Sequence, residues 1–139
     1  MIFQKRYYVN TTAAVDLLPV THEVHYAIRD AGALQGLVTI CVSGPGAGVM
    51  VCDAQPDVIA GIKHIVQGWE GGARVQSALV GRSVQLPFDN ARVCLLPYTD
   101  VMLCDFELRV QRREFLIQVM GESAVAEAPP AGGENYEQY

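Results

Sequence analysis

Short connections between β-type runs constrain the fold of this chain more than any other feature of its sequence. Its second half contains four runs rich in β-branched and aromatic residues, at 83–88, 92–96, 101–108 and 114–120. Turn residues such as Asp89-Asn90 and Pro97 separate them. Parallel neighbours need a crossover of about a dozen residues or more, so links this short favour antiparallel pairing.

Two helical stripes lie in the first half of the chain. The first follows Thr21, which can cap a helix, and ends at Gly32. The second begins at Pro56, a residue suited to a first helical turn, and its apolar stripe runs to Trp69. Three further β-type runs stand at 3–9, 37–42 and 49–52. The pattern predicts the α+β class, with a mainly antiparallel, β-sandwich-like core and two packed helices.

Length and charge limit the classes of function. The chain has 139 residues and a net charge of −5, which disfavours nucleic acid and anionic membrane surfaces as partners. We expect one domain over residues 1–122 and a flexible acidic tail over 123–139, which is rich in Ala, Pro, Gly and Glu. No apolar run approaches the roughly 20 residues of a membrane span, and no signal peptide is evident, so we expect a cytoplasmic protein.

The four cysteines do not form a recognisable metal or redox motif. They contain no CxxC pair, and each lies within an apolar run, at Cys41, Cys52, Cys94 and Cys104. We therefore expect reduced, buried thiols and no structural zinc. A nucleophilic role for Cys52 would need an adjacent base, and no histidine is close to it in the sequence.

The glycine-rich segment Gly44-Pro45-Gly46-Ala47-Gly48 lies between two β-type runs. It is not a P-loop, because no Gly-Lys-Ser/Thr follows it, and it lacks the spacing of a dinucleotide fingerprint. A hairpin turn is the simpler interpretation. The alternative is a loop whose N–H groups hold an anion that approaches the backbone closely.

Histidines and arginines supply weaker candidates. His22 and His25 are three residues apart on the first helix, and His64 is alone on the second, so no metal-ligand set is complete and polar-face positions are the expectation. A basic cluster near a strand connection could hold a phosphate or form a solvated turn. Its members are Arg109, Arg112 and Arg113.

Longer stretches resemble one family in their order along the chain. DLLPVTHEVHYAIRDAGALQGLVTICV is similar to that family's opening helix, glycine and strand. GPGAGVMVCDAQPDV corresponds to its His-Thr-Thr-Ala-Gly, Thr-Ile-Asn-Glu and Asp-Pro-Asp-Val segments. ARVQSALVGRSVQLPF, NARVCLLPYTDVMLCDF and RVQRREFLIQVMGE correspond to its later segments. From about Phe3 to Glu122 the chain resembles the YjbQ-like family, whose members are called secondary thiamine-phosphate synthase enzymes.

The histidines of the resembled family are not at the corresponding positions. The one before the Thr-Thr-Ala-Gly segment falls on Ser43 or Gly44. The one in the Ala-His-Ile-Lys segment falls on Arg74, and the third belongs to a stretch that is shortened here to about 67–72. The resemblance implies that these histidines form a metal or acid–base cluster, which this chain lacks.

Two acids correspond to family glutamates. Asp105 replaces the glutamate of a Glu-Phe pair, and Asp53 replaces that of Asn-Glu if the alignment gap follows it, since otherwise the position is Cys52. Strand alternation places Asp105 on the side of Leu103, so a core-facing carboxylate there would need a partner, for which Arg74 is the candidate. Asp105 is then either a retained pocket anion or one half of a structural ion pair.

Two carboxylates do not replace three imidazoles near neutral pH, because they provide neither the metal affinity nor the tuned proton donor. We therefore expect a catalytically degenerate YjbQ-like protein that binds a small anionic ligand or a protein partner, with no metal and no cofactor. The expected ligand-binding residues are Ser43, Gly44, Gly46, Ala47 and Arg74.

Two alternatives differ in class. One is an enzyme with altered chemistry, in which Asp53 and Asp105 act as acid and base and Arg74 holds an anion. The other is a structural subunit of a hetero-oligomer that docks through residues 123–139. The family resemblance also implies a homotrimer with pockets near the subunit boundaries.

Overall fold

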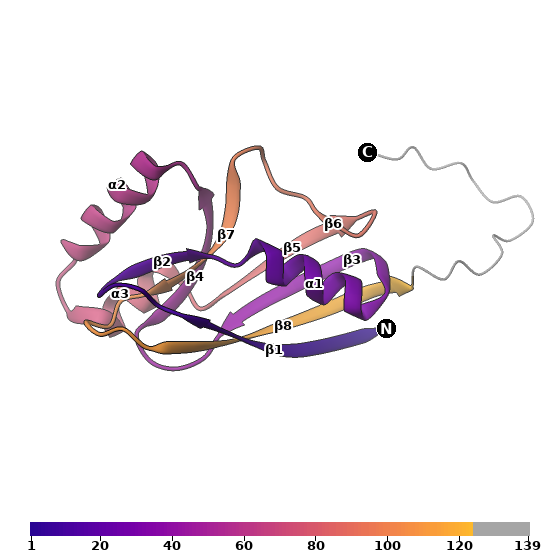
Figure 1. Ribbon diagram of the computed structural model, residues 1–139, viewed down its shortest axis with the longest axis horizontal. Helices are drawn as coiled ribbons and strands as arrows, with labels where there is room; N and C mark the ends of the chain where they lie inside the picture. Colours follow the sequence, from indigo (N-terminus) through magenta and orange to yellow (C-terminus); the bar gives the residue numbers. More distant parts are fainter. Residues whose placement is uncertain (124–139) are drawn as a thin grey trace, which may run out of the picture.

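The computed structural model describes residues 1–123. Within them it has eight strands and three helices (Figure 1). In chain order these are β1 (Ile2–Asn10), β2 (Asp16–Pro19), α1 (Thr21–Ala31), β3 (Ala33–Val42), β4 (Ala47–Asp53), α2 (Pro56–Gln67), α3 (Gly72–Val80), β5 (Ser83–Asp89), β6 (Arg92–Val93), β7 (Thr99–Asp105) and β8 (Arg112–Ser123). Apart from Ser123, which ends β8, the expected acidic tail lies outside the described residues.

The larger sheet has five strands in the order β1-β8-β3-β5-β6, and all of its pairings are antiparallel. The α+β, antiparallel prediction is therefore confirmed. Gly36 and Gly121 face each other across β3 and β8. A Cβ on Gly36 would overlap the carbonyl oxygen of Met120, and one on Gly121 would overlap that of Gln35. Two strands approach so closely there only because both residues are glycine.

The smaller sheet has three strands in the order β2-β7-β4, again antiparallel. Its middle strand, β7, separates two hydrophobic cores, since successive side chains point to opposite faces. Val101 and Leu103 belong to the first core, and Met102 and Cys104 belong to the second. Asp105 follows the parity of Leu103, as strand alternation predicts.

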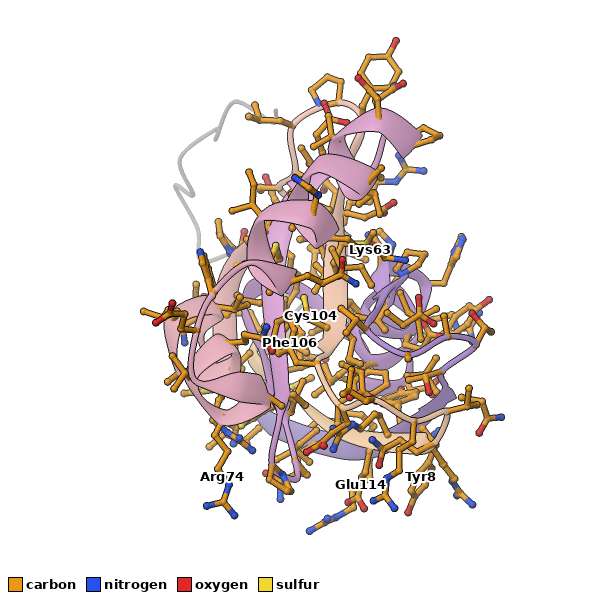
Figure 2. All side chains as sticks on the ribbon, turned by 90° about the vertical axis from the view of Figure 1, so that its left-hand side faces the viewer. Tyr8, Lys63, Arg74, Cys104, Phe106 and Glu114 are labelled. Carbon is orange, nitrogen blue, oxygen red and sulfur yellow. The ribbon has the colours of Figure 1, made fainter. Side chains whose placement is uncertain are left out.

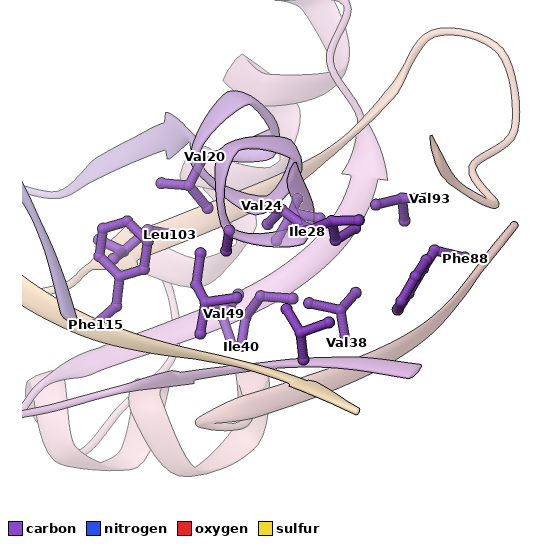
Figure 3. Packing of buried hydrophobic residues seen from close by; sticks show 14 of the residues in the cluster. Val20, Val24, Ile28, Val38, Ile40, Val49, Phe88, Val93, Leu103 and Phe115 are labelled. Atoms are coloured by element: carbon purple, nitrogen blue, oxygen red, sulfur yellow. The ribbon is translucent and has the colours of Figure 1, made fainter. Parts of the chain in front are cut away.

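The first core lies between the five-stranded sheet, the smaller sheet and α1 (Figure 3). The helix contributes the fully buried side chains of Val24 and Ile28, and Gly32, at φ 66°, ends it as expected. Thr21 begins α1 but does not cap it, because its hydroxyl donates to Asp100 Oδ1 at 2.6 Å and accepts from the N–H of Val101 at 3.0 Å. The N-terminus of the helix is thus tied to β7.

The second core lies on the other face of the smaller sheet, under α2 and α3. Val66 and Trp69 pack there against Cys104 and Phe106. The sequence pattern did not reveal α3. Two contacts fix this helix against β4: the Ser77 hydroxyl donates to the Ala47 carbonyl, and the glycine at position 48 leaves room for the chain that ends α3.

The cysteines differ from the expectation of four buried thiols. All are free, but Cys41 and Cys94 are exposed, Cys52 is half-buried and only Cys104 is buried. Cys41 has the opposite parity to the buried Ile40 and Val42, so an apolar run around a residue does not bury it when the strand has a solvent face. Within residues 1–123, none of the helices has the length and apolarity needed to span a bilayer.

Candidate functional site

The glycine-rich loop passes from one sheet to the other. Residues 43–46 join β3 of the larger sheet to β4 of the smaller one, so the hairpin interpretation is wrong. Gly44 and Gly46 have φ values of 86° and 71°, which residues with a side chain rarely adopt. A Cβ on Gly46 would also lie 2.5 Å from Oε1 of Glu107. The two glycines therefore permit both the turn and its close packing.

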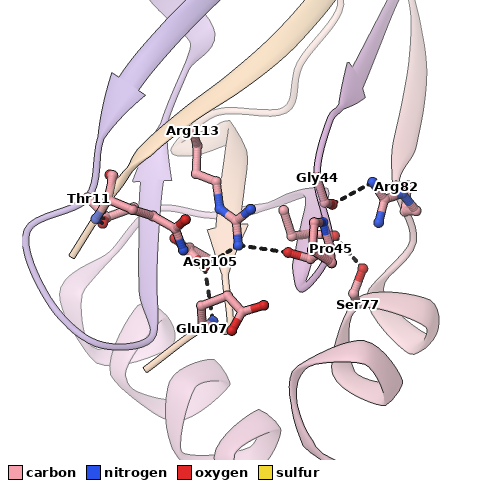
Figure 4. Close-up of polar contacts among 10 residues, drawn as sticks. Thr11, Gly44, Pro45, Ser77, Arg82, Asp105, Glu107 and Arg113 are labelled. Carbon is pink, nitrogen blue, oxygen red and sulfur yellow. Dashed lines mark hydrogen bonds and ion pairs between the residues drawn. The ribbon is translucent and has the colours of Figure 1, made fainter. Parts of the chain in front are cut away.

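Hydrogen-bond donors from three segments hold the loop through its carbonyl groups. Arg82 Nη2 donates to the Gly44 carbonyl at 2.6 Å, and Arg113 Nη2 donates to the Pro45 carbonyl at 2.9 Å (Figure 4). The N–H of Phe106 donates to the Gly46 carbonyl at 2.9 Å. Within residues 1–123, the N–H groups of Gly44 and Gly46 have no acceptor. These N–H groups are left for an acceptor from outside the described chain.

Asp105 and Arg113 form a buried ion pair behind the loop. Arg113 Nη2 lies 2.8 Å from Asp105 Oδ1, and the two residues are 5% and 1% exposed, respectively. The same oxygen accepts a hydrogen bond from the N–H of Glu107 at 3.0 Å. The partner of Asp105 is therefore Arg113 and not Arg74. This geometry favours the structural ion pair over the retained pocket anion.

A small pocket of about 290 Å³ opens on the other side of the loop. Its lining comes from the loop, α3 and the residue before β5, and consists of Pro45, Gly46, Arg74, Ser77, Ala78 and Arg82. Figure 2 shows Arg74 pointing away from the body of the molecule. Within residues 1–123, no carboxylate lies within 4.0 Å of either arginine. The pocket thus presents two guanidinium groups without an ion-pair partner.

The other two predicted loop residues, Ser43 and Ala47, make structural hydrogen bonds. The N–H of Ser43 donates to the Glu114 carbonyl at 3.1 Å, which attaches the loop to β8. The Ala47 carbonyl accepts from the Ser77 hydroxyl. The structure therefore brings Arg74 and Gly46 to the pocket, while Ser43 and Ala47 hold the loop in place at its two ends.

Asp53 does not lie near Asp105. The register pairs Ala47 with Asp105 and Asp53 with Thr99, so the two acids are at opposite ends of β4. At about 3.3 Å per residue, six positions correspond to about 20 Å. The Asp53 carboxylate instead accepts from the N–H of Gln55 at 2.8 Å, just before α2. The two acids do not share one cleft with the loop.

The three histidines lie away from the loop pocket. His22 and His25 are on α1, and His64 is on α2. His25 Nε2 accepts from the N–H of Val93 at 3.3 Å, and partial burial lowers the pKa of His25, with smaller contributions from the charges of Arg92 and His22. Among the residues that the structure describes, no three His, Cys, Asp or Glu side chains are grouped to hold a metal ion.

The basic cluster of the sequence separates in the structure. Arg113 points inward to its ion pair, while the guanidinium of Arg112 lies 3.7 Å from the centre of the Tyr8 ring on the outer face. Arg109 is exposed in the connection before β8. The three arginines therefore do not form one phosphate site.

Sequence reasoning missed two residues that line the loop pocket, Arg82 and Ser77, and it also missed Glu107, which packs on Gly46 from outside that pocket. Nothing in the local pattern marks Arg82, because its partners Val42 and Gly44 are about 40 positions away. Ser77 was hidden by the missed helix. The burial of Arg113 could have been found, because this residue has the same parity along β8 as the apolar residues Phe115, Ile117 and Val119.

This arrangement can bind an anion but offers little acid–base chemistry. Two arginines and a serine line the pocket, and neither an imidazole nor a thiol does. Arginine remains protonated at any physiological pH and suits planar, two-pronged contacts with carboxylates and phosphates. The Cys52 thiol packs with the second core, where burial raises its pKa.

Comparisons with known proteins agree with this fold. A crystal structure of a YbjQ-like protein of unknown function from Sulfolobus solfataricus P2 matches with a TM-score of 0.79 and 15% identity, over 88% of this chain and 99% of the other. The crystal structure of a hypothetical protein from Aeropyrum pernix K1 matches with a TM-score of 0.78 and 19% identity, over 86% of this chain and 99% of the other. The crystal structure of an uncharacterized conserved protein of the YjbQ/UPF0047 family from Clostridium acetobutylicum matches with a TM-score of 0.75 and 19% identity, over 81% of this chain and 97% of the other.

At 15–19% identity, similarity to these solved structures shows the fold alone, so membership of a family has to come from sequence comparison. No curated protein sequence matches the chain. A family model does match it: the model described as UPF0047 protein YjbQ-like aligns with residues 5–122. The chain belongs to the YjbQ-like family.

Proposed function

We propose that this YjbQ-like protein binds a small anionic ligand in the pocket beside the glycine-rich loop, and that it lacks the histidine-dependent chemistry implied by the name thiamine-phosphate synthase. The observation that carries the proposal is the pair of arginines, Arg74 and Arg82, around one pocket with no carboxylate within ion-pair distance among residues 1–123. An unpaired guanidinium at a concave surface is suited to phosphate or carboxylate groups.

The two arginines have different roles in this proposal. Arg82 already donates to the carbonyls of Val42 and Gly44, so it shapes the loop as well as adding charge. Arg74 has no hydrogen bond or ion pair within the described residues and can turn its guanidinium toward a ligand. Of the two glycines with a free N–H, Gly46 lines the pocket and would supply a further donor, as backbone amides do in many anion sites.

The positions of the histidines support the loss of the implied chemistry. The histidine cluster implied by the resemblance needs several imidazoles around one point, and here the imidazoles are divided between α1 and α2. The buried carboxylate of Asp105 is held by Arg113 and is 1% exposed, so it is poorly placed to exchange protons with a ligand.

Isothermal titration calorimetry with inorganic pyrophosphate tests the anion site. We expect saturable binding by the native protein and a loss of roughly tenfold or more in Arg74→Gln, on the scale of one charge-assisted hydrogen bond. The matched control is Arg29→Gln, which removes an exposed arginine from α1 and should leave the affinity unchanged. Equal binding by all three proteins, or no binding by the native one, would contradict the proposal.

A second measurement addresses the chemistry. The purified protein should contain no stoichiometric zinc and should show no thiamine-phosphate synthase turnover. Turnover that is abolished by Asp105→Asn in a correctly folded variant would instead favour an enzyme that uses the buried acid. The same sample, examined by light scattering, tests the proposed homotrimer, which rests on the family resemblance.

A further inference from the structure

We propose that a second pocket, between α3 and the end of β7, binds a small ligand that carries an ammonium group on an apolar body. This pocket has a volume of about 600 Å³, which is ample for a small organic molecule. It is independent of the anion site, because a different face of α3 lines it. Gly72, Ala73 and Gln76 face this pocket, whereas Arg74, Ser77 and Ala78 face the loop pocket.

The walls of this pocket are mainly apolar and aromatic. Val15, Trp69, Phe106 and Leu108 line it together with Ala73. Figure 2 shows Phe106 on the side of the smaller sheet that α2 and α3 cover. Side chains of this kind bind the apolar body of a ligand, and aromatic faces also attract a cation.

Glu107 supplies the only charged side chain of the lining. Its carboxylate is half-buried and, within residues 1–123, forms neither a hydrogen bond nor an ion pair with a cation. Contacts on either side restrain it: its N–H donates to Asp105, its carbonyl accepts from Val15, and its side chain packs on Gly46. A carboxylate fixed at an apolar pocket without a cation is the natural counter-ion for an ammonium group.

Gln76 provides a second acceptor. It is 7% exposed, and its Nε2 donates to the Val66 carbonyl at 2.9 Å, which fixes the orientation of the amide. Its Oε1 accepts no hydrogen bond from the described residues. An ammonium group has three donors, so it can satisfy both this oxygen and the Glu107 carboxylate.

The first turn of α3 disfavours an ammonium group in this pocket, because the N-terminal end of a helix carries partial positive charge. Gly72 and Ala73 belong to that turn and line the pocket. The full negative charge of Glu107 outweighs the partial positive charge of this helix end. Ligands of matched size and different charge distinguish the two effects.

The experiment follows the fluorescence of Trp69, the single tryptophan of the chain. The probes are 2-phenylethylammonium, its neutral analogue 2-phenylethanol and the anion phenylacetate. We expect saturable change with the ammonium probe, at an affinity roughly tenfold or more above that for the alcohol. Glu107→Gln should remove this preference, whereas Glu70→Gln, an exposed acid next to the tryptophan, should retain it.

Three outcomes would overturn the proposal: equal affinity for the ammonium and the alcohol, tighter binding of phenylacetate, or an unchanged preference in Glu107→Gln. Thermal unfolding of each variant establishes that it is folded before its binding is compared. Because pyrophosphate binding depends on Arg74 and this test depends on Glu107, the failure of one proposal leaves the other in place.

Discussion

Asp105 Oδ1 and Arg113 Nη2 lie 2.8 Å apart and join the two sheets of the molecule, since β7 belongs to the smaller sheet and β8 to the larger one. Both side chains occupy positions that face the first core, at the end where the glycine-rich loop crosses between the sheets. Through the Pro45 carbonyl the same guanidinium also holds the loop, so one arginine connects the end of β7 and the start of β8 to a segment 68 positions earlier in the chain.

Removing that arginine should strongly destabilise the protein. Arg113→Met leaves the Asp105 carboxylate buried without a cation, and breaking a buried pair in this way costs about 3–5 kcal/mol of unfolding free energy. Urea denaturation measures the loss. The control Arg112→Met removes the exposed neighbour that stacks on Tyr8 and should cost no more than about 1 kcal/mol.

The double variant Asp105→Asn with Arg113→Met shows whether the unpaired charge is the cause. It should recover part of the lost stability, because a neutral amide is far less costly to bury than an ion and can still accept from Glu107 N–H. If the double variant is less stable than Arg113→Met, the lost packing of the arginine side chain, and not the unpaired charge, explains the effect.

The close approach of β3 and β8 gives a prediction about glycines. Gly121→Ala should destabilise the protein by about 1–3 kcal/mol, since the new methyl group overlaps backbone atoms that cannot turn aside. Gly61 lies within α2, where a Cβ meets nothing within 4 Å. Gly61→Ala should therefore stabilise by about 0.5–1 kcal/mol. Thermal denaturation should give shifts of opposite sign, and shifts of the same sign would contradict the packing.

The thiols should differ in reactivity. With an aromatic disulfide reagent at pH 8, the exposed Cys41 and Cys94 should react first and Cys52 more slowly, because partial burial and the charges of Asp53 and Asp100 raise the pKa of Cys52. Burial raises the pKa of Cys104 to about 12, so this thiol should react only after unfolding. The variant with serine at positions 41 and 94 should lose the fast phase, and fast labelling of Cys104 would contradict its burial.

Stability should decrease at mildly acidic pH through His25. Burial lowers its pKa from the ordinary 6.5, so below that pH the unfolded chain binds more protons than the folded one. The free energy of unfolding should be unaffected by this group above about pH 7 and should fall as the pH drops below 6.5. Urea titrations at pH 7.5 and 5.5 measure this loss, which His25→Gln should reduce. An imidazole titration by NMR with a pKa above 6.5 would disprove it.

Much of the fold could be predicted from local patterns. Gly32 ends α1 and Pro56 begins α2 because these residues act on the backbone next to them. Alternation placed Asp105 on the side of Leu103 for the same reason. The third helix was missed because it is only nine residues long and begins at two glycines with positive φ, Gly71 before it and Gly72 as its first residue, and contacts with β4 stabilise it more than local propensity does.

The site could be predicted only in part. The loop was found through its glycines and Arg74 through a family resemblance, and both lie at the pocket. The parity of Arg113 marks it as a buried residue, but its pairing with Asp105 was missed because that contact depends on how the two sheets face each other. Glu107 was overlooked for the same reason, since its neighbours Gly46 and Val15 come from distant segments.

The position of β7 between two cores restricts how this chain can change in length. Inserting or deleting one residue between Val101 and Asp105 would exchange the side chains of the two cores and carry a carboxylate into the apolar layer beneath α2. The exposed segment 96–98 before the strand has no such restriction. Relatives of this protein should accumulate insertions in that segment and keep the strand at constant length.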